Sequence, residues 1–154
     1  MDVKDYLKQH RVPFNVLRHP RTETAVGTAN ALDVPRANFA KTVVLMVDGR
    51  PTIAVLQSTY HVKPAEVKNA LGAGVAELAT EEELEKYFPD CETGAVPPFG
   101  SQYGMPTVVD THLAEDEYIV FDGNTHEEAV SMRYKDYQQI EHPHQAEIRD
   151  TSYA

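Results

Sequence analysis

Cysteine is almost absent from this sequence, with Cys91 as the single example among 154 residues. One thiol excludes an internal disulfide and a zinc site built on paired cysteines. Long apolar runs are absent as well, so no segment has membrane-spanning length. The first residues, MDVKDYLKQH, also lack the basic start and the apolar stretch of a secretory signal. These absences predict a protein of the reducing cytoplasm with no membrane partner.

Basic residues are scarce too. The chain has 14 Lys and Arg against 24 Asp and Glu, which gives a formal net charge of -10. Proteins that grip nucleic acid along its backbone present a basic face or stripe, and no basic cluster occurs here. We therefore expect no extensive grip on a nucleic acid, while contact with a short exposed end stays open.

Familiar catalytic signatures are missing. The chain has no GxSxG, Walker, dinucleotide-binding glycine or HExxH motif, and Cys91 stands between Asp90 and Glu92, which are no cue for a lowered thiol pKa. His142 and His144 could share one side of an extended segment, but no third ligand is evident. We expect no metal site and no cofactor, and spacing alone does not reveal the reaction.

What the sequence does contain is the composition of one globular domain. Its residues are 42% hydrophobic and 25% charged, values that argue against wholesale disorder. Apolar residues at helical spacing predict helices over residues 2–10, 24–32, 64–71, 80–88 and 134–140. β-favouring runs predict strands over residues 14–16, 42–47, 52–56, 107–109, 118–121 and 130–132. The Asp48-Gly49 pair predicts a tight hairpin turn between two of these strands.

This pattern predicts an α/β domain of the α+β type, in which helices flank a mixed sheet that contains at least one antiparallel hairpin. No repeat, low-complexity segment or linker divides the chain. We expect the domain to span residues 1–140. Residues 141–154 are polar and are expected to form a loose C-terminal tail.

Three places in the chain combine residues in an unusual way. The first is Phe39-Ala40-Lys41-Thr42, where a lysine opens a strongly apolar strand. A charged group beside a buried strand is costly unless it reaches solvent or a partner. Lys41 is therefore either a strand-end lysine that extends its ammonium group to solvent, or a cation at a pocket mouth, placed for a carbonyl or phosphate oxygen.

The second place is the loop Gly94-Ala95-Val96-Pro97-Pro98-Phe99-Gly100. Its paired prolines stiffen the chain, and its flanking glycines permit backbone conformations that other residues avoid. Such a loop is either a plain turn or a device that aims several N–H groups at one point. In the second case those N–H groups stabilise a developing oxyanion.

The third place is Gly123-Asn124-Thr125-His126, directly after the strand predicted over residues 118–121. A histidine at a strand-end turn is either an ordinary surface residue or a group that orients a substrate and carries a proton near neutral pH. His19, which precedes Pro20, has the same two interpretations.

The three motifs occur in an order and at separations that resemble the YbaK family. This family includes free-standing trans-editing proteins and the insertion domain of bacterial prolyl-tRNA synthetase. The resemblance runs from about residue 12 to residue 140. Its carriers are His19-Pro20 with Thr24, Phe39-Ala40-Lys41-Thr42, Asp48-Gly49, Gly94-Ala95-Val96-Pro97-Pro98-Phe99-Gly100, Pro106-Thr107-Val108-Val109-Asp110 and Gly123-Asn124-Thr125-His126. The ordered set over most of a domain is more specific than any one of its pieces.

The resemblance implies an α/β fold with a curved mixed sheet and a cleft for the aminoacylated 3′ end of tRNA. Family members hydrolyse the ester that joins a wrong amino acid to that end. By position, Lys41 corresponds to the family's active-site lysine, and Gly94 with Pro98 to its GxxxP loop. His126 corresponds to a histidine found in many free-standing editors. The implied catalytic residues are thus Lys41, Gly94 and His126.

The resemblance also implies a set of substrate contacts around these three residues: Thr42, Val96, Pro97, Pro98, Phe99, Gly100, Asn124 and His19. On this basis the loop amides would hold the ester carbonyl, and Lys41 would anchor the carbonyl or the terminal phosphate. The substrate's own ribose hydroxyl would help to position the attacking water, so no protein nucleophile is required.

Substrate and partners stay open at this point. Thr42 stands where alanine-specific editors often carry asparagine, so alanine, cysteine, serine and threonine are all candidate amino acids. The acidic balance adds an aminoacyl-tRNA synthetase as a candidate partner that presents the mischarged tRNA. The alternative function is a non-catalytic binding or regulatory module that takes an amino-acid or nucleotide ligand in the same fold.

Overall fold

The computed structural model describes residues 1–151 and confirms the expected helices and strands. Its helices are α1 (Val3–Gln9), α2 (Ala25–Ala31), α3 (Pro64–Leu71), α4 (Glu81–Tyr87) and α5 (Tyr134–Glu141), with short 3-10 helices η1 (Arg36–Asn38), η2 (Gly100–Tyr103) and η3 (Leu113–Glu115). Its strands are β1 (Asn15–Arg18), β2 (Ala40–Val47), β3 (Arg50–Gln57), β4 (Ala76–Leu78), β5 (Thr107–Asp110), β6 (Tyr118–Asp122), β7 (Glu128–Arg133) and β8 (His144–Ala146). The sequence pattern did not predict β4 and β8.

Local chemistry explains where several helices begin. Thr80 and Glu83 form a reciprocal capping box at the start of α4, which satisfies two backbone donors at once. The Thr24 hydroxyl accepts the N–H of Gly27 at the start of α2, as a good N-cap residue does. Pro64 occupies the first turn of α3, where its missing N–H has no helical partner to lose.

The Asp48-Gly49 pair makes the tight turn between β2 and β3. Its residues have φ values of 50° and 78°, in the left-handed region that aspartate and glycine tolerate best. The Asp48 carboxylate also accepts the N–H groups of Gly74 and Val75, which ties the turn to the chain leading into β4. β2 and β3 pair antiparallel over their whole length.

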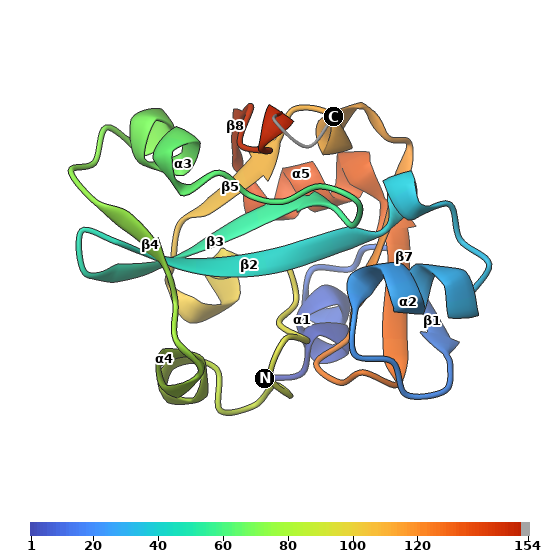
Figure 1. Ribbon diagram of the computed structural model, residues 1–154. Coiled ribbons are helices and arrows are strands. Elements are labelled where there is room, and N and C mark those ends of the chain that lie inside the picture. Colours follow the sequence, from blue (N-terminus) through green and yellow to red (C-terminus); the bar gives the residue numbers. More distant parts are fainter. Residues whose placement is uncertain (152–154) are drawn as a thin grey trace.

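The strands form two sheets that meet at one place (Figure 1). The β1–β7–β6 sheet is antiparallel, whereas the β4–β2–β3–β5–β8 sheet is mixed, with parallel pairing of β3 to β5 and of β5 to β8. An isolated parallel bridge between Phe39 and Val120 joins β2 to β6. This arrangement confirms the predicted α/β fold, a mixed sheet flanked by helices.

Three apolar clusters cover the faces of these sheets. The largest contains Phe99 and Tyr137 and packs against residues of α1, α4 and α5. α3 covers a second cluster through Val67, and α2 covers a third through Ala29. Figure 1 shows α1 and α4 on one side of the β2–β3 hairpin and α3 on the other. Because Phe99 belongs to the largest cluster, core packing decides where the glycine–proline loop lies.

The expectation of a loose tail is wrong for residues 141–151. β8 adds to β5 as a parallel edge strand, and Ile148 is fully buried. The Asp110 carboxylate, which is 1% exposed, accepts the N–H of Ile148 and the guanidinium of Arg149. A polar segment thus joins the fold because a buried carboxylate needs donors. Residues 152–154, the rest of the expected tail, lie outside the described residues.

Two findings bear on the expectations about membranes and metals. Within residues 1–151, no helix combines the length and the apolar character that crossing a membrane requires. The same part of the chain contains no cluster of three His, Cys, Asp or Glu side chains arranged to hold a metal ion. His144 lies in β8, and His142 is the left-handed C-cap of α5.

Candidate active site

The candidate site lies along an unpaired edge of β2. On this edge β4 pairs with β2 from Leu45 onward, and the bridge to β6 precedes Ala40. Between them, residues 40–43 have no neighbouring strand on this edge within the described chain, while β3 pairs with their other edge. The Val44 carbonyl accepts an N–H from the segment after β4. Main-chain directions alternate along a strand, so the N–H and C=O of Thr42 point to this open edge as well.

A cavity of about 230 Å³ opens at this edge. Its walls are Thr42, Val43, Val44, Leu78, Ala79, Leu84, Gly94 and Val96. β2, β4, α4 and the glycine–proline loop therefore all contribute to it, and most of the lining is apolar. The Thr42 hydroxyl is buried and has no hydrogen-bond partner in the described chain. A larger open groove of about 710 Å³ at the Asp48 end of the hairpin contains none of the expected site residues.

Two N–H groups of the glycine–proline loop are free. The prolines have none, and the other amides are satisfied: Ala95 donates to Glu92, Phe99 to Pro97 and Gly100 to Thr107. The amides of Gly94 and Val96 have no hydrogen-bond partner among residues 1–151, and both residues line the cavity. Gly94 has a φ of 84°, a conformation that would strain other residue types.

The far end of the loop is built into the core. The Phe99 ring is fully buried and lies 5.1 Å from the Tyr137 ring, measured between centroids. The Tyr137 hydroxyl donates to the Pro98 carbonyl at 2.7 Å. A Cβ on Gly100 would lie 2.4 Å from the Thr107 hydroxyl oxygen. Neither Phe99 nor Gly100 lines the cavity, and their packing instead holds the loop in place.

Lys41 is a half-buried cation without a counter-ion at the open edge of β2. Its side chain makes no ion pair and no hydrogen bond within the described chain, and burial lowers the pKa of its ammonium group. Alternation along β2 turns the Lys41 and Thr42 side chains toward opposite faces. Thr42 faces the cavity, whereas Phe39, on the Lys41 face, packs in the cluster under α2.

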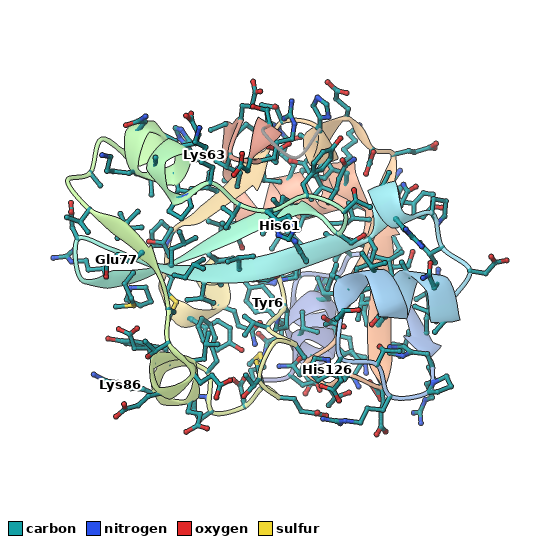
Figure 2. The ribbon with its side chains drawn as sticks, in the orientation of Figure 1. Tyr6, His61, Lys63, Glu77, Lys86 and His126 are labelled. Atoms are coloured by element: carbon teal, nitrogen blue, oxygen red, sulfur yellow. The ribbon has the colours of Figure 1, made fainter. Side chains whose placement is uncertain are left out.

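His126 stands against the glycine–proline loop. Its Nε2 lies 2.6 Å from the Thr93 carbonyl oxygen, and because a carbonyl only accepts, Nε2 carries the proton. In the neutral ring Nδ1 is therefore left as an acceptor. A Cβ on Gly94 would lie 3.5 Å from the ring's Cε1, so the ring packs on glycine backbone. Figure 2 shows His126 on the same side of β2 as Tyr6, away from Lys63.

Asn124 and His19 flank the β6–β7 turn, and neither lines the cavity. The side-chain oxygen of Asn124 accepts the Val3 N–H, and its amide group donates to the Cys91 sulfur. Asn124 therefore ties α1 to the turn. His19 Nδ1 lies 2.8 Å from the Pro20 carbonyl oxygen, and its Nε2 is buried without a hydrogen-bond partner in the described chain.

Asp122, the last residue of β6, is a buried group that the sequence pattern did not single out. Its side chain has an unpartnered Oδ1 in the described chain. Burial raises its pKa to about 7, while nearby His126 lowers the pKa and Glu92 raises it. The signal in the sequence was a charged residue at the end of an apolar strand, the same signal that singled out Lys41.

Replacing Asp122 with asparagine is expected to stabilise the protein at alkaline pH. The folded chain keeps this carboxyl protonated up to a pKa of about 7, whereas an unfolded chain releases the proton near pH 4. Folding therefore takes up a proton between about pH 4 and 7, so the stability of the parent protein falls across this window as pH rises. The variant should exceed the parent by about 2–4 kcal/mol at pH 8 and by little near pH 4.

Urea denaturation of both proteins at pH 5 and pH 8 measures this difference. Asp5, which is exposed on α1, offers a matched control, because Asp5→Asn is expected to change stability by less than about 0.5 kcal/mol at either pH. A gap between Asp122→Asn and the parent that stays constant with pH would show that this carboxyl ionises normally in the folded chain.

The fold and the site define an α/β domain whose open strand edge faces a rigid glycine–proline loop. Residues 19–140 match the aminoacyl-tRNA editing domain family, and the chain belongs to this family. The finding confirms the resemblance to YbaK-type proteins.

Bacterial proline–tRNA ligases are among the curated relatives. Over 120 residues the chain is 31% identical to the ligase of Nitratidesulfovibrio vulgaris, a match that covers 73% of this chain and 20% of the ligase. Over 95 residues it is 30% identical to the ligase of Geobacillus thermodenitrificans, which covers 62% of this chain and 17% of the ligase. The chain therefore spans about a fifth of the length of the ligases it matches.

Two crystal structures share the fold. The hypothetical protein APE2540 superimposes with a TM-score of 0.87 at 17% identity, covering 96% of this chain and 99% of that chain. A proposed trans-editing enzyme for prolyl-tRNA synthetase superimposes with a TM-score of 0.83 at 20% identity, covering 96% of this chain and 94% of that chain. At this low sequence identity, the two superpositions establish a common fold and nothing further.

Proposed function

We propose that this chain is an aminoacyl-tRNA deacylase that hydrolyses the ester between a wrong, small amino acid and the 3′ end of tRNA. One observation carries the proposal: the free amides of Gly94 and Val96 and the unpartnered hydroxyl of Thr42 belong to residues that border one cavity. Membership of the aminoacyl-tRNA editing domain family supports the same class of reaction.

The two free amides suit the carbonyl group of the scissile ester. When water attacks this carbonyl, its oxygen becomes an anion, and N–H groups already aimed at that position stabilise the transition state. Burial of Phe99 in the core would keep the loop preorganised for this task. An aminoacyl ester is already activated, so oriented water suffices and no protein nucleophile is needed.

Lys41 is proposed to anchor the terminal phosphate of the tRNA. Its side chain leaves β2 on the face opposite Thr42, so it reaches beyond the cavity that would hold the aminoacyl group. An ammonium group whose pKa burial has lowered gains from an anionic ligand, because an opposite charge raises that pKa and favours the charged form. The other role considered for this lysine is contact with the ester carbonyl. That role fits less well with a side chain that leaves β2 on the face opposite Thr42.

His126 is proposed to orient the ribose hydroxyl or the attacking water. The Thr93 carbonyl holds the proton on Nε2, which leaves Nδ1 free to accept an O–H group. The ring packs against Gly94, next to the proposed position of the oxyanion. The substrate's own hydroxyl would then help to place the water.

The cavity suits a small amino acid. Apart from Thr42 and Gly94, its lining consists of valine, leucine and alanine side chains. Alanine, cysteine, serine and threonine remain the candidates. The apolar lining suits alanine and cysteine, and the unpartnered Thr42 hydroxyl would meet the hydroxyl of serine or threonine.

Contact with the tRNA is proposed to be limited to its 3′ end. The formal net charge of -10 offers no broad electrostatic grip on a phosphate backbone. An aminoacyl-tRNA synthetase that holds the rest of the tRNA is therefore the proposed partner, and the cytoplasm is the proposed place of action.

Replacing Lys41 with alanine tests the proposal. The substrates are tRNA for proline charged with alanine, cysteine, serine, threonine or proline, and the measurement is the rate of ester hydrolysis at micromolar protein. The variant is expected to be about tenfold to a hundredfold slower on the preferred substrate, because one charged hydrogen bond is lost. Lys63→Ala is the matched control, since Lys63 is an exposed lysine at the start of α3 that does not line the cavity, and its rate should stay within about twofold of the parent.

The outcomes separate the two candidate functions. A parent protein that hydrolyses none of the five charged tRNAs excludes the deacylase. A rise in melting temperature with an aminoacyl-adenosine analogue, without any turnover, would instead support a binding module. A Lys41→Ala protein as fast as the parent would remove this lysine from the mechanism.

A further inference from the structure

Two buried acceptor atoms beside the β6–β7 turn lack a donor. His19 Nδ1 faces the Pro20 carbonyl oxygen, which only accepts, so the proton of the neutral ring lies on Nδ1. Its Nε2 is then an acceptor, and it is buried without a partner in the described chain. Oδ1 of Asp122 is a second such acceptor. The two residues are 8% and 9% exposed.

The β1–β7–β6 sheet places these acceptors on one face. Leu17 in β1 and Asp122 in β6 both pair with Ala129 in β7, so the three form a row across the sheet. His19 follows Leu17 by two residues, and its N–H still donates to the Glu127 carbonyl. Because side chains alternate between the two faces of a strand, the His19 side chain lies on the same face as Leu17 and Asp122. Two strand spacings, about 10 Å, separate β1 from β6, and both side chains therefore lie on one face at the turn end of the sheet, beside the α2 cluster that covers Ala129.

His126 connects these two acceptors with the proposed ester site. It lies in the turn that follows Asp122, and its carbonyl accepts the N–H of Thr22, which follows His19 closely in the chain. The His126 ring contacts Gly94, and the pair of acceptors therefore adjoins the proposed ester site.

The cationic side chains near this group do not supply the missing donors. Arg21 is bound to Glu92 at 2.6 Å, and Lys4 is bound to Glu128. Lys41 makes no ion pair in the described chain. A buried acceptor that meets no donor costs free energy, and a ligand that brings donors would recover it.

We propose that Asp122, together with His19, binds the α-ammonium group of the aminoacyl ester. This assignment rests on the proposed deacylase function and specifies how its substrate is recognised. An ammonium group carries three N–H donors and a positive charge, which matches a set of acceptors that includes a carboxylate. The bound cation also favours the ionised form of Asp122, because an opposite charge lowers a carboxyl pKa.

A substrate with an acylated amino group lacks these properties. Acylation removes the positive charge and two of the three N–H donors, and it adds bulk beside a buried carboxyl group. The site therefore selects aminoacyl-tRNA over N-acylated aminoacyl-tRNA, the chemical class to which peptidyl-tRNA belongs.

The test compares alanyl-tRNA with N-acetylalanyl-tRNA made by acetylating the same charged tRNA. The parent protein is expected to hydrolyse the free-amine substrate about tenfold to a hundredfold faster, the range for one charged hydrogen bond. Asp122→Asn is expected to hydrolyse alanyl-tRNA about tenfold more slowly than the parent and N-acetylalanyl-tRNA at the parent's rate. The ratio between the two substrates thus collapses in the variant.

Asp116→Asn is the matched control. Oδ2 of Asp116 is also buried without a partner in the described chain, but Asp116 precedes β6 whereas Asp122 ends it. This variant is expected to keep the parent's substrate ratio. Thermal unfolding confirms that both variants are folded. A folded Asp122→Asn protein that also keeps the parent's ratio would overturn the assignment.

A binding measurement separates this assignment from the deacylase proposal. The probe is 3′-alanylamino-3′-deoxyadenosine, a stable amide analogue, titrated by calorimetry beside its N-acetyl derivative. If the parent hydrolyses neither tRNA but binds the free-amine analogue at least about tenfold tighter, and Asp122→Asn abolishes that preference, the ammonium site stands and the deacylase fails. If the parent hydrolyses both tRNAs at equal rates, the deacylase stands and the ammonium site fails.

Discussion

A chain that ends at His142 is expected to lose cooperative folding. The deletion removes β8 from the edge of β5 and also the fully buried Ile148, whose burial contributes about 2 kcal/mol. It also takes the Ile148 and Arg149 donors away from the Asp110 carboxylate. Breaking a buried pair from one side costs about 3–5 kcal/mol. Together these losses approach the whole stability of a typical domain.

Circular dichroism during thermal unfolding measures the effect of this deletion. In the full chain, Ile148→Ala is expected to fold and to lose about 2–4 kcal/mol. Glu147→Gln removes only an exposed ion pair with Arg149 and should change stability by less than about 1 kcal/mol. A shortened chain that unfolds cooperatively near the parent's midpoint would show that β8 is dispensable.

Replacing Gly100 with alanine is expected to destabilise the protein by about 3–5 kcal/mol. The new Cβ would lie 2.4 Å from the Thr107 hydroxyl oxygen and 2.5 Å from the Met105 carbonyl oxygen. The Thr107 hydroxyl cannot move away freely, because it accepts the Gly100 N–H and donates to Glu141 at 2.6 Å. Displacing it leaves the buried Glu141 carboxylate with one donor fewer.

Gly104→Ala is the matched control for the steric argument. Gly104 has a φ of 70°, and nothing lies within 4 Å of a Cβ built there. Only backbone strain remains, which costs about 1 kcal/mol. Urea denaturation of both variants measures the contrast, and equal losses would mean that crowding at Gly100 is not the cause.

Local chemistry made most of the elements predictable. The helix that begins after Thr80 and the Asp48-Gly49 turn both occur where the sequence predicted them. The reason is that capping and turn formation involve residues within a few positions of one another. The same reasoning missed β8, because its pairing with β5 brings together segments far apart in the chain. The donors that Asp110 requires are equally distant in sequence.

Some features of the candidate site could be predicted from the sequence, and others became visible only in the structure. The sequence drew attention to Lys41, Gly94 and His126 through an ordered resemblance to one family, and the resemblance included the loop that the structure places beside His126. It did not show that, within residues 1–151, the Gly94 and Val96 amides are the two N–H groups of that loop without a partner. It also did not single out Asp122, although a charged residue at the end of an apolar strand was the available signal.

The linear order of residues, taken alone, decided the helices, the hairpin, the acidic charge and the family, because these depend on neighbours in the chain or on composition. Folding decided which polar atoms are left without a partner. Whether a buried amide, hydroxyl or carboxyl oxygen meets a donor or an acceptor depends on segments that contact each other only in three dimensions. The unsatisfied atoms of Thr42, His19 and Asp122 are the product of that arrangement, and they mark where a ligand completes the site.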